Sequence, residues 1–196
     1  MAHHIYFSDS FVLGRYTASE WDSRVVLFTQ ELGLVTAVVK GYRRPTSKLR
    51  PHLSLFAQTK VGLVRGKETW RLIFCESTGL VERVIKARPK RIVVGKILAV
   101  IRRLIKGEYP HPEIFQELLE SIESLAPVSP EDREVLEQIE LIRVFRTLHH
   151  LGYAPDLPEL RPFIQNKSLP GVVGLAPEIR RLMVETINSS LQATHL

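Results

Sequence analysis

Short hydrophobic runs follow one another through the first eighty residues. Each run is rich in Val, Ile, Thr, Phe and Leu, and turn residues separate it from the next run. Gly33 and Gly66 stand at two hairpin junctions, where we expect a positive φ. The runs are HHIYFSDSFVLGRYT, SRVVLFTQ, LVTAVVKGY, LFAQTKVGLVR and ETWRLIFCES. Five such runs predict five strands, and this number favours a small β-barrel.

The hydrophobic period changes after residue 80. In RPKRIVVGKILAVIRRLIKGE, the apolar residues fall on one arc of a helical wheel and the basic residues fall on the other. Pro110 and Pro112 follow this stretch and oppose its continuation. The pattern predicts an amphipathic helix, over about 88–106, whose outer face is almost wholly basic.

Three further helices are predicted after this basic helix. The second is PEIFQELLESIESLA, the third follows a candidate N-cap at Ser129 and ends at Gly152, and the fourth is PEIRRLMVETINSSLQ. Apolar residues wrap much of the third helix, so we expect it to lie at the centre of a bundle. The chain is therefore predicted to be an α+β protein, with a five-stranded barrel in residues 1–80 and an α-helical bundle domain in residues 81–196.

Charge divides the chain more sharply than its net value of +6 indicates. Residues 1–80 hold eleven basic and six acidic residues, residues 81–107 hold nine and one, and residues 108–196 hold seven and fourteen. Cations are thus concentrated in the first half of the chain. A basic half predicts a polyanion-binding surface, for which nucleic acid is the first candidate and an anionic membrane the second.

A basic stretch, KGYRRPTSKLRP at residues 40–51, joins the third and fourth predicted strands. Pro45 and Pro51 oppose regular strand pairing, so we expect its cations to lie on a loop. A merely solvated surface is the alternative for any basic loop. The candidate nucleic-acid contacts are Lys40, Arg43, Arg44, Lys48, Arg50, Arg65, Lys67, Arg71, Arg91, Lys96, Arg102, Arg103 and Lys106.

Two aromatic residues accompany these cations. Small five-stranded barrels bind single-stranded nucleic acid with a positive groove and with aromatic rings that stack on bases. Tyr42 in the basic loop and Trp70 beside Arg71 are the candidates for stacking. Each has an alternative interpretation, because Trp70 is equally suited to the core and Tyr42 to bracing the loop.

Motifs of catalysis and of metal or cofactor binding are missing from the sequence. There is no GxSxG, P-loop, GxGxxG or HExxH pattern. Cys75, the single cysteine, lies in an apolar run typical of a buried structural thiol rather than a nucleophile. His3, His4, His149 and His150 could in principle bind a metal, but adjacent residues on a helix do not share a face, so His149 and His150 are poorly placed for chelation. We expect no enzymatic activity, no metal and no cofactor.

The chain also lacks the sequence features of a targeting or membrane-spanning segment. It has no amino-terminal leader pattern, and no stretch approaches the roughly 18 apolar residues that cross a bilayer. With a single cysteine, it cannot form an internal disulfide. These features favour a cytoplasmic protein.

Two stretches of the sequence have a distinctive order of residues. The first is WDSRVVLFTQELGLVTAVVKGYRRPTSKLRPHLSLF, in which a strand ending in LFT, a glycine turn, KG and a basic loop with SKLR occur in that order. The second is LHHLGYAPDL at residues 148–157. Together they resemble the RecO family of bacterial DNA repair and recombination mediators, which implies an OB-fold barrel followed by a helical domain without an enzymatic site. Many members follow the second stretch with a four-cysteine zinc module, and the absence of these cysteines here removes zinc.

The same resemblance implies a function and partners. Proteins of this family bind single- and double-stranded DNA, anneal complementary strands, and with RecR help load recombinase onto DNA coated by single-strand DNA-binding protein. In some members the helical domain receives the acidic, apolar carboxyl-terminal tail of that coating protein. A strip of Arg143, Arg146 and His150 on the third helix is the candidate tail site, and pairing of these arginines with neighbouring Glu residues is the alternative.

Other function classes remain open at the level of sequence. An RNA-binding module would use the same barrel and the same basic surface. An interaction protein would instead lay its basic helix on an anionic membrane surface, although Pro89 and Gly95 make a long lipid-binding helix less favourable. A DNA repair and recombination mediator is the interpretation that we favour.

Overall fold

The computed structural model describes residues 4–165 and 174–194. It divides into two compact units, and each unit contains two separate segments of the chain. The barrel unit consists of Met1–Arg83 and Ile105–Phe115, and the helical unit consists of Val84–Leu104 and Gln116–Leu196. The predicted domain boundary at residue 80 stays a prediction, and the units are described separately below.

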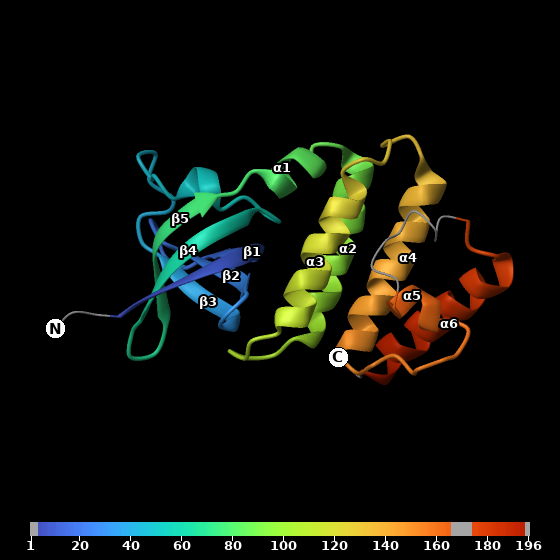
Figure 1. Ribbon diagram of the computed structural model, residues 1–196. Helices are drawn as coiled ribbons and strands as arrows, with labels where there is room; N and C mark the ends of the chain where they lie inside the picture. Colours follow the sequence, from blue (N-terminus) through green and yellow to red (C-terminus); the bar gives the residue numbers. More distant parts are fainter. Residues whose placement is uncertain (1–3, 166–173, 195–196) are drawn as a thin grey trace. The chain divides into compact units, whose positions relative to one another are not determined.

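Five strands form the closed barrel that the sequence predicts (Figure 1). Their order around the barrel is β1-β2-β3-β5-β4. Neighbouring strands are antiparallel except β3 and β5, which pair in parallel through Ala37 and Trp70 and through Val38 and Arg71. The strands are β1 (Ile5–Thr17), β2 (Ser23–Thr29), β3 (Gly33–Val39), β4 (Gln58–Arg65) and β5 (Trp70–Ser77). The fold class is therefore confirmed.

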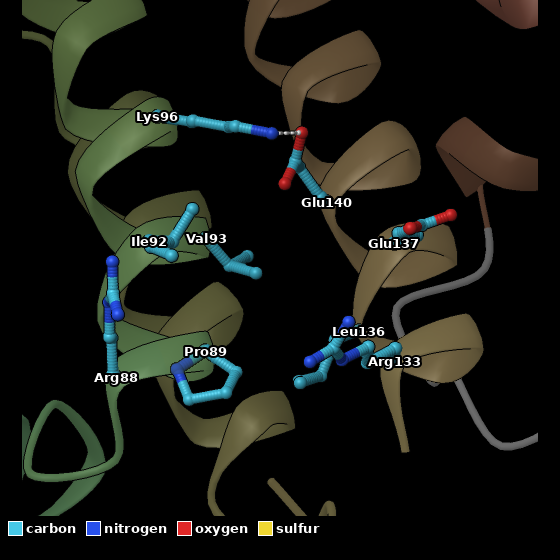
Figure 2. Close-up of a pocket in the computed structure, with 9 residues that line it drawn as sticks. All are labelled: Arg88, Pro89, Ile92, Val93, Lys96, Arg133, Leu136, Glu137 and Glu140. Atoms are coloured by element: carbon cyan, nitrogen blue, oxygen red, sulfur yellow. Dashed lines mark hydrogen bonds and ion pairs between the residues drawn. The ribbon is translucent and has the colours of Figure 1, made fainter. Parts of the chain in front are cut away.

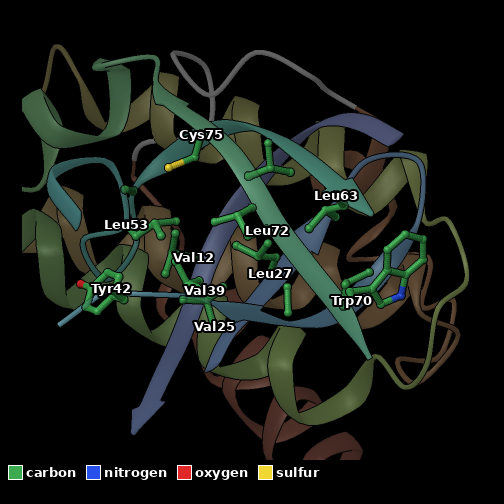
Figure 3. Close-up of a cluster of buried hydrophobic side chains, with 14 residues drawn as sticks. Val12, Val25, Leu27, Val39, Tyr42, Leu53, Leu63, Trp70, Leu72 and Cys75 are labelled. Carbon is green, nitrogen blue, oxygen red and sulfur yellow. The ribbon is translucent and has the colours of Figure 1, made fainter. Parts of the chain in front are cut away.

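Side chains that point into the barrel form one hydrophobic cluster (Figure 3). Alternate positions of β3 show the pattern clearly, since Val35, Ala37 and Val39 are buried while Thr36 is exposed. Figure 3 shows Tyr42 and Trp70 at opposite sides of this cluster. Both residues are buried members of the cluster, so both rings belong to the core. Burial of this apolar surface is the main source of the barrel's stability.

The two hairpin glycines differ in backbone conformation. Gly33 has a φ of 70°, as expected for the turn between β2 and β3. Gly66, in the turn between β4 and β5, does not have a positive φ, and that prediction is wrong. A Cβ at Gly66 would instead lie 2.7 Å from the carbonyl oxygen of Thr69, so close backbone approach requires glycine there.

The segment Ile105–Phe115, here called the clasp, packs against the barrel within the same unit. The backbone N–H of Leu34 donates to the carbonyl oxygen of Gly107 over 3.1 Å. The ring of Phe115 contacts Phe11 and Phe28, with ring centroids 5.2 Å and 5.6 Å apart. Phe11 and Phe28 are fully buried, so the clasp completes the barrel's hydrophobic packing.

The helical unit is arranged around α4, as the sequence predicts. Helix α4 packs against α2, α5 and α6 (Figure 1). The helices are α1 (Leu80–Val84), α2 (Arg88–Leu104), α3 (Pro112–Leu125), α4 (Arg133–His150), α5 (Arg161–Gln165) and α6 (Pro177–Ala193), and α1 and α3 each extend across the division between the units. No helix in the described ranges is long and apolar enough to cross a membrane.

The start of α4 differs from the sequence prediction. Asp132 rather than Ser129 is the N-cap, because its carboxylate accepts a hydrogen bond of 3.4 Å from the backbone N–H of Val135. Gly152 follows the helix with a φ of 76°, as a residue that ends a helix often does.

Candidate nucleic-acid interface

A hollow of about 550 Å³ opens on the barrel unit beside the basic loop. We call it the basic hollow. Among the described residues, no carboxylate lines it. Its lining residues are Arg15, Tyr16, Thr17, Ser23, Tyr42, Arg43 and Arg50. Three guanidinium groups, two hydroxyls and two phenols can donate hydrogen bonds there, and this donor set suits phosphate oxygens.

Two parts of the chain form the basic hollow. One is the end of β1 and the start of β2, where Thr17 pairs with Ser23 in the strand register. The other is the loop between β3 and β4, which contains a single 3-10 turn at Arg50–His52. The predicted position of the basic stretch on a loop is therefore confirmed. Local sequence alone cannot show that the end of β1 supplies a further arginine to it.

Tyr42 links these two parts from inside the barrel. Its side chain is 5% exposed, and the guanidinium of Arg15 lies 5.0 Å from its ring centroid and donates to its hydroxyl. The expected stacking of a base on Tyr42 is not available in this structure because the ring is buried. Its alternative role is the correct one, since Tyr42 holds Arg15 at the hollow and anchors the loop.

Backbone hydrogen bonds join the loop to the turn between β1 and β2. The N–H of Arg43 donates to the carbonyl oxygen of Trp21 over 3.0 Å, and the N–H of Gly41 donates to Asp22 Oδ1 over 2.8 Å. The guanidinium of Arg44 lies 5.9 Å from the ring centroid of Trp21, a cation–π contact. The turn and the loop thus form one structured surface beside the basic hollow.

All five cations of the basic loop are exposed. Arg43 and Arg50 line the basic hollow, and Arg44 lies against Trp21. Lys40 and Lys48 are on the same loop without lining the hollow. The structure thus gathers part of the predicted set at one place, and contact of these residues with nucleic acid remains a proposal.

Trp70 requires the second correction among the predicted aromatic contacts. Its side chain is 5% exposed, and its ring meets the edge of Tyr6 with centroids 5.3 Å apart. The guanidinium of Arg65 lies 4.8 Å from its ring centroid. Trp70 therefore serves the core and cannot stack on a base in this structure. Arg65 also pairs with Glu108 of the clasp, and Arg65, Lys67 and Arg71 lie outside the basic hollow.

Sequence reasoning missed five residues at or near the basic hollow. Arg15, Tyr16, Thr17 and Ser23 line it, and Trp21 lies under Arg44 with 44% of its surface exposed. A signal was available for Trp21, because a large aromatic residue in the polar turn ASEWDS has no core position to occupy. Arg15 and Tyr16 gave no local signal, since they belong to a strand that is otherwise hydrophobic.

The candidate contact cations predicted on the basic helix are all exposed, and Lys96 and Arg103 also contact other helices. Lys96 pairs with Glu140 over 2.7 Å, and Arg103 donates to the carbonyl oxygen of Leu191 near the end of α6. These two residues help to join the helices of the helical unit. Arg91 and Arg102 are exposed on α2, while Lys106 is exposed on the clasp of the barrel unit.

Arg143 and Arg146 are buried rather than displayed on a surface. Their side chains are 2% and 3% exposed, and their guanidinium groups lie 2.9 Å and 3.0 Å from the two carboxylate oxygens of Glu117 on α3. Glu120 contributes a second carboxylate to this buried ion-pair network. Burial lowers the pKa of Arg146, and Glu117 opposes that shift. These arginines cannot form an exposed tail site, so the alternative of internal pairing is correct; His150 is exposed.

A groove between α2 and α4 offers a different surface in the helical unit. It has a volume of about 370 Å³ and is mainly apolar where α2 and α4 face each other. Figure 2 shows Pro89 facing Leu136 toward one end, and Lys96 joined to Glu140 across the other. The remaining lining residues are Arg88, Ile92, Val93, Arg133 and Glu137.

Cys75 has the environment of a structural thiol. It is buried in the barrel cluster, and burial raises the pKa of its thiol to about 11. A thiol that stays protonated at neutral pH is a poor nucleophile. Within the described part of the chain, no three His, Cys, Asp or Glu side chains are grouped to hold a metal ion, and His3 lies outside that part.

Comparison with known proteins identifies the family. Residues 1–81 match the model for the Recombination protein O N terminal, and residues 92–159 match the model for the Recombination protein O C terminal. Together the two matches cover most of the chain.

Individual relatives agree with the family models. DNA repair protein RecO of Pseudoalteromonas atlantica is 35% identical over 107 residues, which cover 55% of this chain and 44% of that protein. DNA repair protein RecO of Gloeothece citriformis is 26% identical over 117 residues, which cover 60% and 41%. The RecO protein of Actinobacillus pleuropneumoniae serotype 5b is 29% identical over 122 residues, which cover 57% and 46%. The chain spans less than half the length of these curated relatives. With both family models matched in order along one chain, the protein belongs to the RecO family.

Proposed function

We propose that this protein binds DNA through the basic hollow and its loop, and that it acts in DNA repair and homologous recombination without an enzymatic step. The observation that carries the proposal is the concentration of Arg15, Arg43 and Arg50 around a hollow that no described carboxylate lines. Arginine binds phosphate oxygens in a bidentate way, and each phosphate contact releases counterions from the nucleic acid. Membership of the RecO family supports DNA as the polyanion.

The mediator role follows from strand electrostatics. Two complementary strands repel each other through their phosphates, and cations that hold one strand lower the cost of bringing up the other. The basic hollow would hold one strand, and exposed cations such as Arg91 on α2 would contact a second. By resemblance to the family, the protein would anneal strands and, with RecR, help load recombinase onto DNA coated by single-strand DNA-binding protein.

Salt-dependent binding tests the proposed DNA site. Anisotropy of a labelled single-stranded oligonucleotide is titrated across a salt series with wild type and with an Arg43→Ala, Arg50→Ala double variant. We expect the variant's slope of log affinity against log salt to be shallower by roughly 0.7 for each phosphate that the variant no longer binds. Lys60→Ala is the matched control, since Lys60 is exposed on β4 between Asp9 and Glu76 in the strand register.

Other outcomes of this assay would contradict the proposal. Equal slopes for wild type and the double variant would remove the basic hollow from the interface. Tighter binding to a matched RNA oligonucleotide would favour the RNA-binding alternative. Flotation with anionic liposomes, without binding to either nucleic acid, would favour the membrane-surface alternative.

A second proposal concerns the partner tail. Because Arg143 and Arg146 are buried, we place the acidic, apolar tail of single-strand DNA-binding protein in the groove between α2 and α4. Its walls contain Ile92 and Leu136, which suit an apolar side chain, and Arg88 and Arg133 suit acidic groups. Titration of a labelled acidic, apolar tail peptide against Arg88→Glu and Arg133→Glu tests this placement. Weaker binding is expected, with Arg161→Ala unchanged as the control, since Arg161 pairs with Asp156 outside the groove; unchanged binding in the two Glu variants would contradict it.

A further inference from the structure

The indole of Trp21 contacts the guanidinium of Arg44 but is not buried in the core. Its surface is 44% exposed in the turn between β1 and β2, whereas Trp70 is 5% exposed and completes the barrel core. An exposed indole keeps a large apolar face in contact with water, which is unfavourable unless something covers it. The position of Trp21 beside the basic hollow raises the question of what ligand would cover that face.

The backbone around Trp21 is held in place from both sides. Within the turn, the N–H groups of Ala18 and Ser19 donate to the carbonyl oxygen of Asp22, and the N–H of Asp22 donates to Ser19 Oγ. From the loop, Arg43 donates to the Trp21 carbonyl oxygen through its N–H. The ring therefore projects from a fixed support rather than from a loose loop.

A single residue connects Trp21 to the proposed phosphate site. Arg43 lines the basic hollow with its side chain while its backbone binds Trp21. Its neighbour Arg44 places a planar guanidinium over the Trp21 ring. Tyr16, 48% exposed, adds a second accessible aromatic ring at the hollow itself. Cations and accessible rings thus lie together, which is the combination that proteins use to hold single strands.

We propose that Trp21 stacks on an unpaired base while the basic hollow holds the adjoining phosphates. This inference rests on the proposed function and specifies the form of the ligand. Bases within a duplex already stack on one another and have no free face, so Trp21 adds affinity only for a single strand. The site therefore distinguishes single-stranded from double-stranded DNA through Trp21, whereas its arginines contact both forms.

Oligonucleotides with and without bases test the stacking role. Anisotropy titrations compare a thymidine oligonucleotide, an abasic oligonucleotide of equal length and a duplex, using wild type, Trp21→Ala and Trp21→Phe. We expect Trp21→Ala to weaken binding of the thymidine oligonucleotide roughly tenfold and to leave the abasic strand and the duplex unchanged. The salt slope should stay the same, because stacking releases no counterions, and Trp21→Phe should restore most of the affinity.

Phe7→Ala is the matched control variant. Phe7 is 57% exposed near the amino-terminal end of β1, where it pairs with Gly62 rather than with residues of the basic hollow. Removing it should change no affinity. An equal loss in Phe7→Ala and Trp21→Ala would overturn the inference, because it would show a general effect of exposed rings on the barrel.

Three further results separate this inference from the proposed function. Salt-sensitive binding that is unchanged in Trp21→Ala would overturn the stacking role alone. An equal loss on thymidine and abasic strands would also overturn it, since Trp21 would then only support the loop. Absence of salt-sensitive binding by wild type would overturn the proposed function and the role of Trp21 with it.

Discussion

Arginine has opposite roles in the two compact units. Around the basic hollow, Arg43 and Arg50 are exposed and described carboxylates are absent from the lining. In the helical unit, Arg143 and Arg146 are buried against Glu117. Both sets look like basic strips in the sequence. The difference lies in the helix that faces these arginines, because α3 brings the Glu117 carboxylate within hydrogen-bond distance of them. A buried guanidinium without such a partner would be very unfavourable.

Removing the Glu117 carboxylate, which lies between the two buried arginines, should lower the free energy of unfolding more than the other changes below. Glu117→Gln keeps the shape of the side chain but removes the closer of the two carboxylates that Arg143 and Arg146 contact. We expect the free energy of unfolding to fall by roughly 3–5 kcal/mol, measured by urea denaturation. Glu123→Gln, an exposed position on the same helix, is the control and should change it by less than about 0.5 kcal/mol. Similar small effects in both variants would remove the distinction between the units.

Ionisation of the buried Cys75 thiol should change the free energy of unfolding by an intermediate amount that depends on pH. Burial raises the pKa of the Cys75 thiol from 9.0 to about 11, so between these values the folded state keeps a proton that the unfolded state loses. Stability of wild type relative to Cys75→Ala should therefore fall as pH rises from about 9 to about 11, by an amount on the order of 2 kcal/mol. Denaturation curves of both proteins across this range measure the difference. Parallel pH profiles would show that the thiol ionises as easily in the folded barrel as in the unfolded chain.

Loss of an exposed arginine should have the smallest effect on folding. Arg50→Ala removes a cation of the basic hollow, and we expect the free energy of unfolding to change by less than about 0.5 kcal/mol. The same variant should bind single-stranded DNA less tightly, as measured by anisotropy. A loss of stability comparable with that of Glu117→Gln would instead place Arg50 among the structural arginines.

Local patterns predicted the elements of this protein well. Alternating burial in β3 and the amphipathic face of α2 follow directly from the order of apolar and polar residues. The positive φ of Gly33 follows from its place in a hairpin turn. The basic loop was identified because charge and proline occur together in one short stretch. Each of these features depends on residues close together in the sequence.

The features that sequence reasoning missed depend on contacts between distant segments. Burial of Trp70 and Tyr42 is set by the closure of the barrel, and burial of Arg143 is set by Glu117, which precedes it by 26 residues. Gly66 is an exception, because the carbonyl of Thr69 that approaches it belongs to the same turn. Trp21 could have been considered because an aromatic residue in a polar turn is an exception that needs an explanation.

The clasp has a consequence for how the chain folds during synthesis. All five strands have been made by Ser77, yet Phe11 and Phe28 remain without their partner ring until Phe115 has been added. Between these points the ribosome must make α2, which belongs to the other compact unit. The amino-terminal barrel would thus leave the ribosome with an apolar surface uncovered for several seconds at ordinary rates of translation. The barrel unit can therefore be completed only after α2 of the helical unit has been synthesised.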